Sequence, residues 1–290
     1  MWIFFKRYIK KAYEKIYRFI YLNNIYRPTY RYKYTKYNIP ARDDVPYIIN
    51  IVYEDIFGYK TDGIFVEIGA FDGEISSFTC FLADIGWTGH YVEPIKRYLM
   101  YCIQRHKKNK VLCYNFFIGD FVGKSTMFDY GPSSRKTIVN NFKEFTFFGF
   151  DKETGESVNI NCLTMDMFLK NQKIPPEIDL LLIDVEDSEI NVLKSFSLLG
   201  KEYNPTAIII ETSHENETKD ILTSAGYVQY CSLDTDAPLT KNLIFVSRKR
   251  AKEKFPLLNK MKKIKMIPAL NKMKEVKIIN FSDIDSLKPI

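Results

Sequence analysis

The sequence has few histidines, few cysteines and no long apolar run. Its three histidines are too few for a multi-histidine metal site, and its five cysteines form no Cys-x-x-Cys pair. An odd count without such a pair indicates neither a disulfide framework nor a zinc site, so we expect reduced, mostly buried thiols. Apolar runs such as 180–183 fall far short of the roughly 20 residues that span a membrane. The apolar start at residues 1–5 is also too brief for a signal peptide, so we predict a cytoplasmic protein.

Positive charge is concentrated at the two ends of the chain. Residues 1–42 hold eleven Lys or Arg against one acid, and residues 248–277 hold twelve against two. The middle of the chain is therefore acidic, which is not the charge distribution of a uniformly basic nucleic-acid-binding domain. An acidic central region favours the binding of a positively charged ligand. We divide the chain into a basic aromatic N-terminal extension (1–43), a central domain (44–248) and a basic C-terminal tail (249–290).

The N-terminal extension begins with a basic amphipathic pattern. Trp2, Phe5, Ile9, Ile16 and Ile20 recur at helical spacing, and Lys and Arg occupy the opposite face. Such a helix docks on an anionic membrane surface, or it packs on the central domain or on a second subunit in a homo-oligomer. The tail contains two copies of Leu-Asn-Lys-Met-Lys, at 258–262 and 270–274, from which we expect a pair of basic helices.

The central domain alternates strand-like and helix-like segments. Strands are expected at 63–68, 89–92, 111–118, 178–183, 206–211, 227–232 and 243–247, and helices at 75–85, 94–106, 188–199 and 215–225. Alternation of this kind predicts an α/β fold with a mostly parallel seven-stranded sheet and helices on both faces. The last two strands have no helix between them, so we expect an antiparallel hairpin at the sheet edge.

Ligands of open parallel sheets bind beyond the carboxyl ends of the strands, so the residues just after each strand are the candidates for a site. The first strand ends at Glu67 and leads into a loop containing Gly69, Ala70, Phe71, Asp72 and Gly73. Its glycines permit a tight turn and a close approach to a ligand. This loop is neither the Gly-x-Gly-x-x-Gly of nicotinamide enzymes nor a Walker loop. About 20 residues further on, Glu93 comes after the second strand, where an acid can accept hydrogen bonds from ribose hydroxyls.

The later strand ends carry acids and one histidine. Gly119 and Asp120 come after the third strand and are placed to meet an adenine. The fourth strand is followed by four acids, Asp184, Glu186, Asp187 and Glu189. Because like charges repel, a cluster of this kind points to a functional role. Asp187 and Glu189 also suit the start of the next helix. His214 comes after the fifth strand, shortly after Glu211. The residues leave open a divalent ion held by Asp184, Glu186 and Glu211.

Taken together, these segments resemble the FkbM family of methyltransferases. The resemblance covers roughly residues 61–248. Its motifs are VEIGAFDG at 66–73, GWTG at 86–89, VEP at 92–94, IGD at 118–120, LTMD at 163–166, and ID at 178–179 through IDVE at 183–186 to Glu189 and Leu193. Two positions depart from the family pattern: Asp187 stands where the family has glycine, and Leu182 stands where it often has Lys or Ser.

The resemblance implies a class I methyltransferase, Rossmann-like fold, with S-adenosylmethionine as donor and O-methylation, often of sugars in glycans. It places Gly69 to Gly73 at the methionine part of the donor, Glu93 at the ribose, and Gly119 and Asp120 at the adenine. We expect His214 to act as general base, with Asp184 as the alternative base or orienting partner and Glu186 beside them. Two other interpretations are an RNA methyltransferase that grips single strands through the Tyr- and Arg-rich stretch 30–37, and a non-catalytic scaffold. The Asn/Asp-Pro-Pro-Tyr/Phe motif of amino-directed nucleic-acid enzymes is absent.

Overall fold

The computed structural model describes the central part of the chain. It covers residues 60–74, 77–129, 156–234 and 240–249, together with Tyr53, 56–58 and two short strands at 137–138 and 276–278. The predicted N-terminal helix, the stretch 30–37 and the Leu-Asn-Lys-Met-Lys repeats lie outside these residues. No helix in the described part of the chain is both long enough and apolar enough to cross a membrane.

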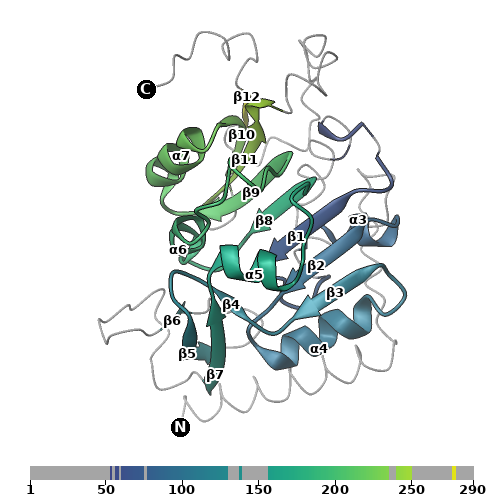
Figure 1. The fold of residues 1–290 in the computed structure, drawn as a ribbon. Coiled ribbons are helices and arrows are strands. Elements are labelled where there is room, and N and C mark those ends of the chain that lie inside the picture. The colour runs from purple at the N-terminus through teal and green to yellow at the C-terminus, as the bar shows by residue number, and fades with distance from the viewer. Residues whose placement is uncertain are drawn as a thin grey trace.

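A large, mostly parallel sheet forms the centre of the molecule (Figure 1). Its strand order is β12-β10-β11-β9-β8-β1-β2-β3, in which β9, β8, β1, β2 and β3 run parallel. The strands are β1 (Ile64–Ile68), β2 (Thr88–Val92), β3 (Val111–Tyr114), β8 (Leu180–Ile183), β9 (Ala207–Thr212), β10 (Tyr227–Asp234), β11 (Lys241–Ser247) and β12 (Val276–Ile278). The seven expected strands are all present, and β10 and β11 form the expected antiparallel hairpin.

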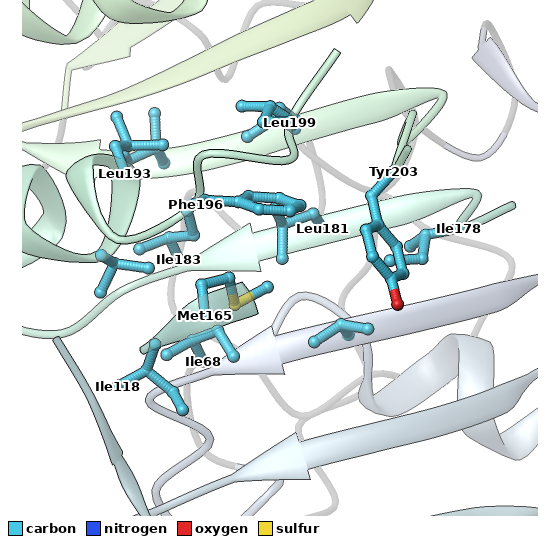
Figure 2. Packing of buried hydrophobic residues seen from close by; sticks show 14 of the residues in the cluster. Ile68, Ile118, Met165, Ile178, Leu181, Ile183, Leu193, Phe196, Leu199 and Tyr203 are labelled. Atoms are coloured by element: carbon cyan, nitrogen blue, oxygen red, sulfur yellow. The ribbon is translucent and has the colours of Figure 1, made fainter. Parts of the chain in front are cut away.

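Helices cover both faces because the central strands are apolar on both sides. They are α3 (Cys80–Asp84), α4 (Lys96–Arg105), α5 (Met165–Asn171), α6 (Glu189–Lys194) and α7 (Glu215–Ser224). On one face Phe65, Leu180 and Leu182 pack with residues of α3. On the other face Leu181 and Ile183 pack with residues of α5, α6 and α7. Figure 2 shows this second cluster, with Leu193, Phe196 and Leu199 lying over the sheet.

The predicted strand at 111–118 is in fact two strands that belong to different sheets. Asn115 interrupts it by donating hydrogen bonds from Nδ2 to the backbone oxygens of Glu93 (3.0 Å) and Pro94 (2.8 Å). The chain then leaves the main sheet and enters a smaller one, ordered β4-β7-β5-β6. Its strands are β4 (Phe117–Ile118), β5 (Gly123–Asp129), β6 (Thr137–Ile138) and β7 (Glu156–Leu163). In Figure 1 this smaller sheet lies beside the arrowheads of β1 and β2.

The C-terminal region adds a strand that the sequence did not predict. Residues 276–278 form β12 and pair antiparallel with β10, with Cys231 opposite Ile278, and the basic helices expected around the two repeats fall outside the described residues. The sheet therefore gains an eighth strand from beyond the central domain. The helix expected at 75–85 is shorter than predicted, and α5 was not predicted at all. Thr164 begins α5 as its N-cap by accepting a hydrogen bond from the Met167 backbone N–H.

Candidate functional site

A cleft opens where the order of the central strands reverses. β1 lies between β2 and β8, and the carboxyl ends of these three strands form the wall of the cleft. This is the switch point at which open α/β sheets bind ligands. The cleft has a volume of about 330 Å³, including its mouth. Its lining residues are Ile68, Gly69, Val92, Glu93, Pro94, Phe116, Phe117, Ile118, Met127, Asp184, Val185 and Glu186.

Gly69 lies where the ends of β1, β2 and β8 come together in this cleft. Its φ of +92° is a conformation that side chains disfavour, and a Cβ there would lie 1.8 Å from the Asp184 backbone oxygen. The Gly69 N–H donates to the Val92 carbonyl oxygen at 2.9 Å. The loop after β1 therefore passes directly against the ends of β2 and β8, and only glycine fits.

Glu93 is fully buried at the next strand end, with 0% of its surface exposed. Its Oε2 accepts a hydrogen bond from the Phe71 backbone N–H (3.0 Å), and its Oε1 accepts one from the Ile95 backbone N–H (2.8 Å). Phe71 has a φ of +50°, an uncommon conformation for a residue with a side chain. Each carboxylate oxygen has a further lone pair, so Glu93 can also accept hydrogen bonds from a ligand in the cleft.

Asp72 and Gly73, also in the predicted donor loop, are not among the residues that line the cleft. Asp72 is buried, and its Oδ1 accepts a hydrogen bond from the Glu74 backbone N–H at 2.9 Å. At Gly73, φ is +71° and a Cβ would lie 2.6 Å from Cys102 Sγ. His106 Nε2 hydrogen-bonds the Gly73 carbonyl oxygen at 2.7 Å. Burial lowers the pKa of His106 to about 4, so this ring is neutral near pH 7. His106 was not predicted from the sequence.

The structure does not bring Glu67 to the cleft. Glu67 shares a sheet face with Phe65, whereas Ile68, on the opposite face of β1, lines the cleft. The Glu67 carboxylate instead accepts hydrogen bonds from Ser77 Oγ (3.1 Å) and Thr79 Oγ1. Burial raises the pKa of Glu67 to about 8. The side chain therefore ties β1 to the segment that enters α3, as a largely protonated acid at neutral pH.

An aromatic and apolar wall lines part of the cleft. Phe116, Phe117 and Ile118 come from the segment that leaves the main sheet, and Met127 comes from β5. Gly119 packs on this wall, since a Cβ there would lie 2.7 Å from the Phe117 ring. Asp120 is exposed at the end of the same segment. Gly119 and Asp120 were predicted from the sequence but the wall was not, although two consecutive phenylalanines stand shortly before Gly119.

A second, smaller hollow adjoins the cleft, and it is too narrow to hold a water molecule. The residues around it are all acids or threonines: Asp184, Glu186, Asp187, Glu189, Glu211, Thr212 and Thr240. We call it the acidic hollow. Asp184 and Glu186 line both the cleft and the acidic hollow. Glu186 and Asp187 have φ values of +56° and +73°, which explains why a glycine suits the position of Asp187. Two consecutive non-glycine residues with positive φ indicate backbone strain, and such strain is found preferentially at functional sites.

Glu189 is the most deeply buried acid of the acidic hollow, with 2% of its surface exposed. Its Oε1 accepts hydrogen bonds from the backbone N–H groups of Val185 and Asp187, both at 3.2 Å. Its Oε2 is buried and has no hydrogen-bonding partner among the described residues. Burial raises the pKa of Glu189 to about 8. Across the hollow, Thr240 Oγ1 donates to Glu211 Oε1 at 3.0 Å.

His214 is not among the residues that line either hollow. It is exposed at the start of α7, and its backbone N–H donates to Thr212 Oγ1 at 3.0 Å. β9 continues one residue further than predicted, to Thr212, so the chain turns at Ser213 and His214 becomes the N-cap residue of α7. Asp184, the alternative base expected from the sequence, lines both the cleft and the acidic hollow.

The described residues do not form a metal centre in this arrangement. No group of three His, Cys, Asp or Glu side chains among them is close enough to hold one ion. This includes the set Asp184, Glu186 and Glu211 that the sequence left open for a divalent ion.

The sequence matches the family model described as the methyltransferase FkbM domain over residues 67–229, more than half of the chain. The chain belongs to the FkbM methyltransferase family. It is accordingly an S-adenosylmethionine-dependent methyltransferase, and the matched segment contains the donor loop, Glu93, Asp184 and the acidic hollow up to Thr212.

Solved structures with a similar fold include other methyltransferases. The fibrillarin pre-rRNA processing protein of Methanococcus jannaschii is 12% identical, with a TM-score of 0.40 and coverage of 65% of this chain and 67% of that one. A putative RNA methyltransferase of Pyrococcus horikoshii is 10% identical, with a TM-score of 0.39 and coverage of 71% and 82%. The METTL16 methyltransferase domain is 14% identical, with a TM-score of 0.41 and coverage of 70% and 66%. No curated protein matches the sequence. The family assignment therefore rests on the match to the FkbM model.

Proposed function

We propose that this FkbM methyltransferase transfers a methyl group to a sugar hydroxyl in a glycan or glycoconjugate. The observation that carries the proposal is the position of Asp184 and Glu186, which line both the donor cleft and the acidic hollow. Two carboxylates at the shared wall of two hollows suit a reaction in which an acceptor hydroxyl must lose a proton.

The residues of the cleft fit S-adenosylmethionine. Gly69 allows the backbone to pass where a Cβ would collide with Asp184. Glu93 is a buried carboxylate that lines the cleft at the end of β2 and is held in place by the Phe71 and Ile95 backbone N–H groups, where it can meet ribose hydroxyls. Phe116, Phe117 and Ile118 provide an apolar wall for an adenine ring. When bound, S-adenosylmethionine supplies an electrophilic methyl group on a sulfonium.

The protein's own contribution is positioning and proton acceptance. A sugar hydroxyl is a weak nucleophile, and a general base beside it typically contributes about 10²–10⁴ in rate. We assign this base to Asp184, which accepts the hydroxyl proton as the acceptor oxygen forms its bond to the methyl carbon. Exposed His214 is outside both hollows, so the geometry favours Asp184 over the base expected from the sequence. Holding the two reactants in line supplies the other large part of the rate.

Methyl transfer to defined fractions tests the acceptor class. The full chain is incubated with methyl-labelled S-adenosylmethionine and either a glycan or an RNA fraction, and the labelled product is hydrolysed and identified. We expect label on a sugar oxygen in the glycan fraction. Label that enters RNA bases, or no label in glycan while RNA is labelled, would refute the proposal.

Two variants test the base. Asp184→Asn should lower turnover at least about tenfold, while donor affinity measured by titration changes much less. His214→Ala is the comparison, and we expect its turnover to stay close to that of the parent. The assignment fails if His214→Ala shows the loss and Asp184→Asn does not.

A further inference from the structure

Two thiols lie against each other beside the predicted donor loop, residues 69–73. Cys102 is on α4 and Cys113 is on β3, and these two elements pack side by side (Figure 1). Their Sγ atoms are 3.7 Å apart. An S–S bond is about 2.05 Å long, so the two sulfurs have to approach each other by only roughly 1.6 Å to form a disulfide.

The two thiols differ in the way that a reactive pair requires. Cys102 is fully buried, whereas Cys113 is partly exposed and can be reached from solvent. The contact with Cys102 lowers the pKa of Cys113, because the Cys102 S–H can donate a hydrogen bond to the Cys113 sulfur and so favours its thiolate. The thiolate is the nucleophilic form of cysteine. Cys113 is therefore suited to react first with an oxidant, and Cys102 to react next with Cys113.

Cys102 also supports the donor loop. A Cβ at Gly73 would lie 2.6 Å from Cys102 Sγ, so the loop packs directly on this sulfur. One turn further along the chain, His106 Nε2 hydrogen-bonds the Gly73 carbonyl oxygen at 2.7 Å. The C-terminal end of α4 therefore holds the end of the donor loop through Cys102 and His106.

Joining the two sulfurs would disturb this support. β3 is held in the main sheet by its pairing with β2, in which Cys113 lies opposite Tyr91. α4 is not part of a sheet, so Cys102 has to supply most of the movement that brings the sulfurs together. That movement changes the packing under Gly73 and the position of His106 on the same helix end.

We propose that Cys102 and Cys113 form a redox switch, in which a peroxide converts the two thiols to a disulfide and thereby weakens binding of the methyl donor. Because the switch acts on the donor loop, it operates with any acceptor.

The oxidation has two steps when the oxidant is hydrogen peroxide. The Cys113 thiolate attacks one peroxide oxygen, so that an S–O bond forms, the O–O bond breaks, and hydroxide leaves and takes up a proton. The Cys102 sulfur then attacks the Cys113 sulfur, so that the S–S bond forms and the S–O bond breaks. The departing hydroxide leaves as water with the Cys102 proton. Two thiols are oxidised to a disulfide, and the peroxide is reduced to water.

Thiol labelling tests whether the disulfide forms. The full chain is treated with hydrogen peroxide, unfolded and labelled with N-ethylmaleimide, which reacts only with free thiols. The reduced chain has five thiols to label. We expect the oxidised chain to lose the labels of Cys102 and Cys113, and its digest to contain a peptide pair linked through these residues. A chain that keeps all its labels, or that loses labels without this link, would overturn the proposal.

Donor binding tests the consequence of the disulfide. S-adenosylhomocysteine is titrated into the reduced chain, the peroxide-treated chain, and the treated chain after reduction with dithiothreitol. We expect the affinity to fall at least about fivefold on oxidation, in the range of ordinary coupling between sites, and to return on reduction. A linked Cys102–Cys113 pair with unchanged affinity would refute the switch.

Three variants locate the effect. Cys113→Ser and Cys102→Ala each remove one partner, so each should bind S-adenosylhomocysteine equally well before and after peroxide. Cys231→Ala removes a buried thiol of β10 that has no part in the pair, and should stay as sensitive as the parent. If peroxide still weakens binding to Cys113→Ser and Cys102→Ala, the pair is not the switch.

Discussion

The buried carboxyl of Glu67 should make the stability of this protein fall as pH rises through neutrality. Burial raises the pKa of Glu67 from 4.5 to about 8, and only the hydrogen bonds from Thr79 and Ser77 oppose that effect. Since the folded-state pKa lies above the unfolded one, the folded state holds the proton more tightly. The stabilising contribution is complete below about pH 4.5 and is lost progressively as pH rises to about 8.

Proton linkage gives the size of the effect. One group that is protonated in the folded state and ionised in the unfolded state changes the free energy of unfolding by about 1.4 kcal/mol per pH unit. Between pH 5.5 and 7.5, Glu67 should therefore remove about 3 kcal/mol, a large part of the 5–15 kcal/mol typical of a folded domain. Glu189 has a pKa raised in the same direction, to about 8, and adds a similar slope.

Urea unfolding at pH 5.5, 6.5 and 7.5 measures this slope. Glu67→Gln keeps the shape of the side chain but never ionises, so we expect it to lose about 1.4 kcal/mol less per pH unit than the parent. Burial lowers the pKa values of His90 and His106 to about 4, so these rings add stability as pH rises towards 6.5 in every variant. Glu67→Gln combined with Glu189→Gln should therefore gain stability from pH 5.5 to 6.5, and Glu202→Gln, at an exposed carboxylate that pairs with Lys170, should match the parent. If the parent and Glu67→Gln have the same slope, Glu67 does not carry a raised pKa and the argument from burial is wrong.

Three further perturbations address the donor site, the strained loop and the N-terminal extension. Glu93→Ala removes two ribose contacts worth about 1.5–3 kcal/mol each, so titration should show donor affinity lower by at least about tenfold, and unchanged affinity would contradict the ribose assignment. Asp187→Gly relieves the backbone at φ +73° and should raise the free energy of unfolding by about 1 kcal/mol, whereas Asp187→Ala should not, and equal urea midpoints would argue against strain. We further propose that the N-terminal extension docks on anionic membranes, so the full chain should pellet with anionic vesicles at low salt, and less so when Trp2→Glu and Phe5→Glu are combined. Equal pelleting of both would exclude docking through this apolar face.

Much of the cleft could be predicted because parallel strands bring their carboxyl ends to one edge. Gly69, Glu93 and Asp184 each come after a different strand, and the alternation of strands and helices is enough to place them together. Glycine at a strand end allows a close backbone approach, and an acid there can accept hydrogen bonds, so both residue types point to a ligand site. The cleft is therefore built largely from positions that the strand pattern already indicates.

Other parts of the site depend on where the chain turns, which local patterns do not contain. The sequence at 111–118 predicts one continuous strand. In the structure, Asn115 donates hydrogen bonds to the backbone at Glu93 and Pro94, and the chain leaves the main sheet there. This redirection makes Phe116, Phe117 and Met127 the wall of the cleft. Likewise, β9 runs on to Thr212 and leaves His214 on an exposed helix start rather than at the site.

The sequence by itself determined the α/β class, the parallel sheet, the family and the residues at three strand ends, because hydrophobic periodicity and glycine placement are local properties. Only the tertiary structure determined which of the acids are buried. Glu67 and Glu189 both resemble ordinary strand-end and helix-start acids in the sequence, yet both are buried, and burial raises both pKa values to about 8. Burial depends on the residues that pack from elsewhere in the chain. For Glu67 they include Ser77 and Thr79, and for Glu189 they include Glu211, Thr212 and Thr240, which line the same hollow.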